Sequence, residues 1–229
     1  MLPGYVYHIT QRCHNRKLLL RPAAVRDEYR RRLRKTLKDS GVSLVSYCLT
    51  SNHVHLAATP REPTDIPCLM RRQQGEFAKW YNRSKGRTGA VWNERYRCTV
   101  VETGRYLWNC MRYIDLNMVR AGVVPHPLKW RWCGYDELVG HRKRHRVLDI
   151  RKVLELTGCA NVDELAGVYG AFLDEALAAN RMKREARWTE SIAVGSKPFV
   201  NEIAGRVRNR TCLDLSQDPD GTWKVRERT

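Results

Sequence analysis

The run His53-Val54-His55 is the sharpest sign of chemistry in this sequence of 229 residues. It lies in a stretch expected to be a strand, where residues i and i+2 point to the same face. Both imidazoles would therefore project together while Val54 faces the core, and two imidazoles on one face suit a divalent metal ion. The same pattern also arises by chance on the wet face of a half-buried strand. This short run alone leaves both interpretations open.

A tyrosine and an asparagine lie four residues apart in the run Tyr113-Ile114-Asp115-Leu116-Asn117. On the helix expected there, i and i+4 side chains share a face, so a tyrosine hydroxyl would stand one turn from an amide oxygen. That pair is a plausible nucleophile beside a metal. The structural alternative is a tyrosine ring in the core and an asparagine that hydrogen-bonds near the helix end. His8, on the first expected strand, could face the same site or be a buried structural histidine.

The elements that must position these residues follow from hydrophobic periodicity and from glycine and proline breaks. Strands are expected at 4–11, 42–49, 53–59 and 97–101, and helices at 22–40, 65–82 and 104–121. This order predicts an α+β domain over residues 1–139, with an antiparallel sheet and helices packed on it.

After this domain, a helical C-terminal appendage is expected over residues 140–210, entered through the basic run 141–146. Helical patterns cover 150–156, 162–179 and 198–208, and a flexible tail is expected over 211–229. The appendage could hold DNA through its lysines and arginines, or it could brace an exposed face of the first domain. Both functions stay open.

The net charge of +18 and the pI near 9.9 indicate a polyanionic partner, and nucleic acid is the natural one. No apolar run approaches the roughly 20 residues needed to span a bilayer, no secretory signal is evident, and no membrane partner is expected. The eight cysteines are scattered without a C-x-x-C pair. We therefore expect a cytoplasmic protein with reduced thiols.

Several basic and aromatic side chains are candidates for contact with DNA. The phosphate-binding candidates are Arg12, Arg16, Lys17, Arg30, Arg31, Arg34, Arg95 and Arg120, and the base-stacking candidates are Trp80, Tyr81, Trp92 and Tyr96. The arginines could instead form a solvated helix face, and the aromatic rings could belong to the core.

Four ordered runs together carry a family resemblance that no single run carries. They are Tyr7-His8-Ile9-Thr10-Gln11-Arg12, Ser51-Asn52-His53-Val54-His55-Leu56, Gly89-Ala90-Val91-Trp92-Asn93-Glu94-Arg95-Tyr96 and Tyr113-Ile114-Asp115-Leu116-Asn117-Met118-Val119-Arg120-Ala121-Gly122. Over roughly residues 3–139 the chain resembles the IS200-like transposase superfamily. The spacing of the runs is most similar to that of the REP-associated tyrosine transposases.

The resemblance implies a ferredoxin-like HUH nuclease core that cuts and rejoins single-stranded DNA at hairpins or palindromic repeats. By position, Tyr113 would be the catalytic nucleophile, forming a 5′-phosphotyrosine, and His53, His55 and Asn117 would bind the metal, Mg²⁺ or Mn²⁺. The family includes monomers and dimers, so the oligomeric state stays undetermined. Met118 replaces a usual proline and Cys13 a common glycine, but neither change removes a catalytic group.

Two rival functions remain beside the active strand transferase. A domesticated protein could bind structured nucleic acid without cutting it. A metal-dependent hydrolase could use the histidine pair to activate water, although its nearest acids, Glu62 and Asp65, lie beyond the following strand in a proline-containing loop.

Overall fold

The computed structural model describes residues 1–180, 183–207 and 212–228. Within these ranges a single sheet holds seven strands in the order β2-β3-β1-β4-β5-β7-β6. The strands are β1 (Val6–Arg12), β2 (Val42–Leu49), β3 (His53–Pro60), β4 (Arg97–Val101), β5 (Ala193–Gly195), β6 (Leu213–Gln217) and β7 (Trp223–Glu227). The expected α+β class is thus confirmed.

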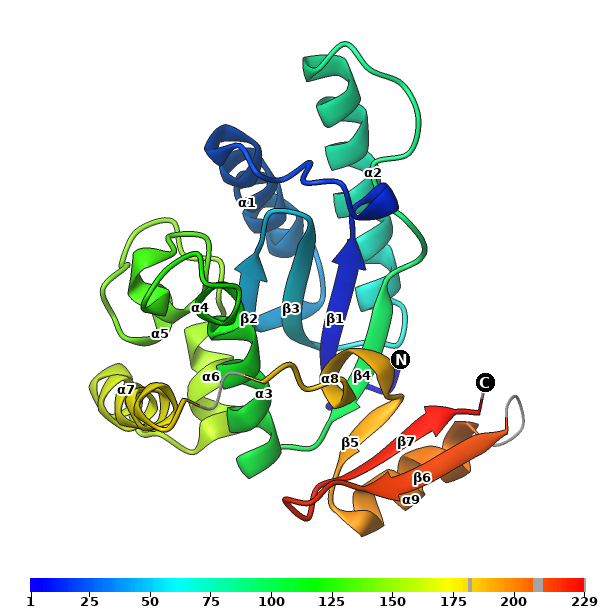
Figure 1. The fold of residues 1–229 in the computed structure, drawn as a ribbon, viewed down its shortest axis with the longest axis vertical. Coiled ribbons are helices and arrows are strands. Elements are labelled where there is room, and N and C mark those ends of the chain that lie inside the picture. The colour runs from blue at the N-terminus through cyan, green and yellow to red at the C-terminus, as the bar shows by residue number, and fades with distance from the viewer. Residues whose placement is uncertain (181–182, 208–211, 229) are drawn as a thin grey trace.

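Helices cover both faces of the sheet (Figure 1). Those of the first part are η1 (His14–Arg16), α1 (Ala23–Lys38), α2 (Asp65–Ser84), α3 (Arg105–Asp115), α4 (Asn117–Arg120), η2 (Pro127–Lys129) and α5 (Tyr135–Leu138). The later ones are α6 (Ile150–Thr157), α7 (Val162–Ala178), α8 (Arg187–Glu190) and α9 (Lys197–Val207). Helices α1 and α2 pack on one face of the sheet, and α3 packs on the other.

The two helices behind the sheet are held by aromatic packing. Tyr29 of α1 and Phe77 of α2 are fully buried, and their ring centroids lie 5.0 Å apart. Trp92, from the loop before β4, lies 5.6 Å from Phe77. Offset and edge-on ring pairs of this kind add about 0.5–1.5 kcal/mol beyond the apolar area that they bury. This cluster fixes the loop 92–96 against α2.

The single helix expected over 104–121 is in fact two helices that break at Leu116. Leu116 has φ −79° and ψ 4°, so the chain turns there between α3 and the short α4. Its amide still donates to the carbonyl of Arg112, which explains why an uninterrupted helical pattern shows in the sequence. The break lies between Tyr113 and Asn117 and therefore adjusts their relative position.

The C-terminal part differs from the helical appendage with a flexible tail that the sequence predicted. Helices α6, α7 and α9 match three expected helices, but β5, β6 and β7 extend the sheet. Strand β5 pairs in parallel with β4, so the sheet is mixed rather than purely antiparallel. The expected flexible tail is wrong for β6 and β7, which form an antiparallel pair in which Leu215 lies opposite Val225. The parts of these expectations that concern 181–182, 208–211 and 229 lie outside the described residues.

No helix in the described part of the chain is long and apolar enough to cross a membrane. All eight cysteines are free, and Cys13, Cys48, Cys110 and Cys133 are buried.

Candidate active site

The histidine pair lies on β3 in the interior of the sheet, with both rings on the face that α3 covers. Thr10 is the β1 partner of His55, and Arg12 is the partner of His53. Because side chains directly opposite each other share a face, His8, Thr10 and Arg12 of β1 accompany the two histidines. The ring centroids of His53 and His55 lie 4.7 Å apart. The expected projection of both imidazoles to one side is therefore present.

His55 is held by a chain of hydrogen bonds that fixes which nitrogen carries its proton. The Nδ1 atom of His8 lies 2.7 Å from the carbonyl oxygen of Trp188, which can only accept, so this nitrogen donates. Burial lowers the pKa of His8 to about 4, so its ring is neutral and its Nε2 accepts. That Nε2 lies 2.9 Å from Nδ1 of His55, which must therefore donate. Since burial also lowers the pKa of His55 well below its usual value, its Nε2 keeps a lone pair.

His53 also carries its proton on Nδ1 and is neutral, because of its own neighbours. Its Nδ1 lies 2.7 Å from the amide oxygen of Asn52 and 2.9 Å from the hydroxyl of Thr50. Nδ1 therefore donates, and its Nε2 is left with a lone pair. Burial, and after it the positive charges of Arg12 and Arg120, lower the pKa of His53 to about 3. Both residues of the pair are thus neutral imidazoles at pH 7.

Tyr113 and Asn117 meet the histidines from the helical side. The side-chain nitrogen of Asn117 lies 3.0 Å from Nε2 of His55, and the Tyr113 ring centroid lies 5.9 Å from that of His55. Tyr113 is 5% exposed, with Trp188 packed 6.3 Å away ring to ring. Burial raises its pKa, which Arg120 partly offsets. The guanidinium carbon of Arg120 lies 4.3 Å from the Tyr113 ring centroid.

The donor set fits a divalent cation held by few protein ligands. Unprotonated imidazole nitrogens are the form that metals bind. The Asn117 nitrogen now donates to His55 Nε2, and rotating the amide group would release that lone pair and present the amide oxygen instead. The described residues contain no group of three or more His, Cys, Asp or Glu side chains that could hold a metal ion. A cation here would therefore depend on His53, His55 and Asn117.

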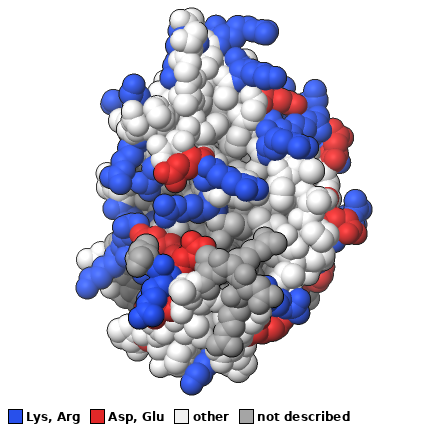
Figure 2. Space-filling model, turned by 90° about the vertical axis from the view of Figure 1, so that its right-hand side faces the viewer, with Lys and Arg blue, Asp and Glu red and all other residues white. Residues whose placement is uncertain are grey.

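A cleft of about 530 Å³ opens beside the histidine pair. Its lining includes His53 and His55 and is dominated by cations: Arg12, Arg16, Arg95, Arg97 and Arg184, against the two acids Glu94 and Glu190. Burial, and after it the charges of Arg16, Arg184 and Arg97, lower the pKa of Arg12. Cations crowded together in this way are stabilised when a polyanion binds beside them. Lys and Arg side chains also spread over the face shown in Figure 2, with smaller acidic patches between them.

The turn that carries Arg16 into the cleft has an unusual backbone. Asn15 and Arg16 have φ values of 50° and 56°, in the left-handed region that costs most residues about 1 kcal/mol or more. Asn52 stabilises the turn because its Nδ2 donates to the carbonyl of Arg16 at 3.1 Å. One asparagine thus orients both His53 and a cleft arginine.

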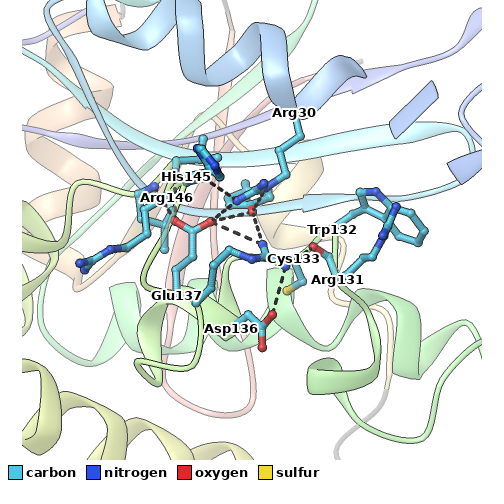
Figure 3. A network of polar contacts seen from close by, with 12 residues as sticks. Arg30, Arg131, Trp132, Cys133, Asp136, Glu137, His145 and Arg146 are labelled. Carbon is cyan, nitrogen blue, oxygen red and sulfur yellow. Dashed lines mark hydrogen bonds and ion pairs between the residues drawn. The ribbon is translucent and has the colours of Figure 1, made fainter. Parts of the chain in front are cut away.

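The other predicted phosphate contacts are dispersed. Lys17 is exposed beside Arg16, and Arg34 is half-buried on α1. Arg31 pairs with Glu28 on the same helix. Arg30 lies in the polar network of Figure 3, where it donates to the fully buried Glu137 at 2.9 Å. Arg30 is therefore engaged in this network. The predicted arginines nearest the histidine pair are Arg12, Arg16 and Arg95 in the cleft, and Arg120 beside Tyr113.

The sequence left three contributors to the site unassigned. It did not single out Asn52, although its place before the histidine pair in the second run was visible. It left the position of His8 open, and it could not find Trp188, because that residue lies 180 positions from the histidine that it contacts. The sequence offers no signal for such a long-range backbone contact.

Comparison with known proteins gives two kinds of match. The family model described as "Transposase IS200 like" matches residues 2–117, just over half of the chain. A solved REP-associated tyrosine transposase, bound in that structure to a REP hairpin, is similar over 60% of this chain and 81% of its own, with 19% identity and a TM-score of 0.50. A Deinococcus radiodurans protein described as a transposase covers 54% of this chain and 96% of its own, at 18% identity and a TM-score of 0.37. No curated protein sequence matches the chain.

The fold, with a histidine pair on the sheet and a tyrosine on the helix that covers it, is that of a tyrosine transposase. The chain belongs to the IS200-like transposase family.

Proposed function

We propose that this transposase is a metal-dependent endonuclease and strand transferase for single-stranded DNA, acting at hairpins or palindromic repeats. The observation that supports this most strongly is the meeting of Tyr113 and Asn117 with His53 and His55, from α3, α4 and β3. The basic cleft beside these residues has the charge that a phosphate backbone needs. Hairpin DNA is favoured as the substrate because a transposase of the same fold has been solved with a REP hairpin.

In the proposed reaction the Tyr113 hydroxyl oxygen attacks the phosphorus of the scissile phosphodiester in line. A bond forms between that oxygen and phosphorus while the bond from phosphorus to the 3′ oxygen breaks, which leaves a 3′-hydroxyl and a 5′-phosphotyrosine. The phenol loses its proton in this step, and the leaving 3′ oxygen gains one. Attack by a 3′-hydroxyl on the phosphotyrosine reverses the bonds and joins strands without ATP.

The remaining side chains bind and orient. A divalent cation, Mg²⁺ or Mn²⁺, held by His53, His55 and Asn117 would neutralise charge on the scissile phosphate. Arg12, Arg16 and Arg95 would hold the neighbouring phosphates in the cleft. The burial that raises the pKa of Tyr113 also excludes water from the nucleophile.

The test uses a labelled hairpin oligonucleotide with single-stranded extensions, incubated with the full-length protein and Mn²⁺. Wild type should form a covalent protein–DNA adduct that survives denaturing electrophoresis. Tyr113→Phe should form none while binding the oligonucleotide nearly as well, and Tyr106→Phe is the matched control because Tyr106 lies on the same helix. Cleavage without an adduct would favour the hydrolase, and binding without cleavage would favour a non-cleaving binder. An adduct that persists in Tyr113→Phe would overturn the assignment of the nucleophile.

A further inference from the structure

A second cavity, of about 410 Å³, lies on the opposite side of the loop 92–96 from the histidine pair. Its walls are the start of α2, through Cys68, Met70 and Gln74, and the loop residues Trp92 and Tyr96. This volume is in the range of about 300–1,000 Å³ that is typical of ligand pockets. Nothing in the chemistry proposed for Tyr113 uses this cavity.

The cavity adjoins the basic cleft, because the two share part of their lining. Gln11, Glu94 and Arg95 line both, so the end of β1 and the loop 92–96 form the rim between them. Side chains alternate along β1, so Gln11 belongs to the α2 face while Thr10 and Arg12 belong to the α3 face. A strand of DNA in the cleft can therefore cross this rim and reach the second cavity.

A buried polar atom in the cavity wall lacks a partner. Gln74 is 8% exposed, and its Nε2 donates to the hydroxyl of Tyr29 at 3.0 Å. Its Oε1 is buried and has no hydrogen-bond partner among the described residues. Leaving a buried acceptor unsatisfied costs free energy, so a ligand donor that reached this atom would be stabilised by it.

The walls combine this acceptor with flat aromatic side chains and cations at the rim. Trp92 and Tyr96 are half-buried, and the guanidinium carbon of Arg95 lies 5.9 Å from the Tyr96 ring centroid. Arg71 of α2 also lines the cavity and is exposed. Aromatic rings that stack bases, next to cations that hold the backbone, are the usual means of binding single-stranded nucleic acid.

We propose that this cavity is a subsite for one unpaired nucleobase of the DNA strand that leaves the basic cleft. The base would stack on Tyr96 or Trp92, the Gln74 acceptor would take an N–H from its Watson–Crick edge, and Arg95 and Arg71 would hold its phosphate. A base in a duplex cannot use that edge, because its N–H groups are already paired. The proposal rests on the proposed function, since it needs a DNA strand in the cleft.

The experiment measures binding of a fluorescent hairpin oligonucleotide, in which each nucleotide of the single-stranded extensions is replaced in turn by an abasic site. The full-length protein carries Tyr113→Phe so that the strand stays whole. We expect one position at which removing the base weakens binding about tenfold, the size of one lost base–aromatic stack, and smaller effects elsewhere.

Filling the cavity tests where that base lies. Cys68 is exposed on α2 at the cavity wall, so Cys68→Trp should block the cavity without disturbing the core. It should weaken binding of the intact oligonucleotide about tenfold and make the abasic substitution silent, as expected for two changes at one contact. Cys212→Trp is the matched control, because Cys212 is an exposed cysteine outside the cavity. Tyr96→Leu should act as Cys68→Trp does, and Tyr96→Phe should retain binding.

Each outcome of these binding measurements either supports the base subsite or overturns it. If no position is sensitive, or if Cys68→Trp weakens the intact and abasic oligonucleotides equally, the base subsite is wrong even where wild type still forms its covalent adduct. If wild type forms no adduct and does not bind the hairpin, the proposed function fails and the subsite fails with it. A cavity that instead binds a protein partner would leave DNA affinity unchanged in Cys68→Trp, which also overturns the proposal.

Discussion

The imidazoles of His8 and His55 are joined nitrogen to nitrogen across neighbouring strands, with Nε2 of His8 2.9 Å from Nδ1 of His55. His8 in turn donates to the carbonyl of Trp188, from the C-terminal part of the chain. His8 is therefore a positioning residue, which turns the His55 ring and keeps its Nε2 unprotonated, the form that can bind a metal. Partners of this kind are worth about 10–100-fold in metal affinity.

His8→Leu should accordingly weaken Mn²⁺ binding by about 10–100-fold in a protein that still unfolds cooperatively. Isothermal titration of Mn²⁺ measures the affinity, and thermal melting reports the fold. His141→Leu is the control, because His141 is exposed in the loop after α5. Unchanged Mn²⁺ affinity in folded His8→Leu would show that His55 does not depend on His8.

The two histidines of the pair should differ in their effect on stability. His55→Ala leaves Nε2 of His8 and Nδ2 of Asn117 without their buried partner, so it should lower the free energy of unfolding by about 1–3 kcal/mol. His53 is half-buried, and its removal should cost less than about 1 kcal/mol. Urea denaturation of the metal-free proteins measures both. Equal losses would mean that the contacts of His55 contribute nothing particular to folding.

These contrasts show what the sequence could and could not predict. The period of two fixes the common face of His53 and His55, and strands 42–49 and 97–101 were predicted at their observed bounds. The turn at Leu116 was missed because the hydrogen bonds of the helix continue through it. Strand β5 was missed because its three residues are all buried and show no alternation.

Glu137 anchors the segment after α4 to the core, so substituting it should lower the free energy of unfolding strongly. Its fully buried carboxylate accepts from Arg30 (Figure 3). It also accepts from the Tyr47 hydroxyl and from the amides of Val147 and Leu148. Glu137→Gln keeps the shape but removes the charge and places an NH₂ group among donors.

The expected loss is about 3–5 kcal/mol of unfolding free energy, because the half-buried Arg30 loses its charged partner and the new NH₂ group meets donors in a fully buried position. Glu155→Gln, in an exposed pair with Lys152, should cost less than about 1 kcal/mol. A similar small loss in both variants, measured in urea, would contradict a stabilising role for the network.

Thiol labelling should separate the cysteines by environment. Burial raises the pKa of Cys13 and of Cys98 to about 12, so at pH 9 only about one thiol in a thousand of either is ionised. The exposed Cys68 and Cys212 should react rapidly with maleimide in the native protein. At pH 9 Cys13 and Cys98 should stay largely unlabelled over the time in which Cys68 and Cys212 react to completion. Mass spectrometry of the labelled protein identifies the sites, and rapid native labelling of Cys13 would mean that β1 opens readily.

The C-terminal part could brace the sheet or bind DNA, and variants of two of its residues distinguish these functions. Trp188 is 1% exposed and packs on Tyr113, so Trp188→Ala should lower the free energy of unfolding by about 3–5 kcal/mol by leaving a cavity, with little change in the salt dependence of DNA binding.

Arg184 is exposed in the cleft lining and pairs with Glu190 at the surface. Arg184→Ala should leave stability within about 0.5 kcal/mol but reduce the slope of log K against log salt by about one. Lys183→Ala, an exposed neighbour outside the cleft lining, is the matched control for the slope. Because a phosphate contact changes the salt slope and a packing contact changes the unfolding free energy, the two measurements on these variants assign each residue to one function. A salt slope unchanged in Arg184→Ala would leave bracing as the function of this segment.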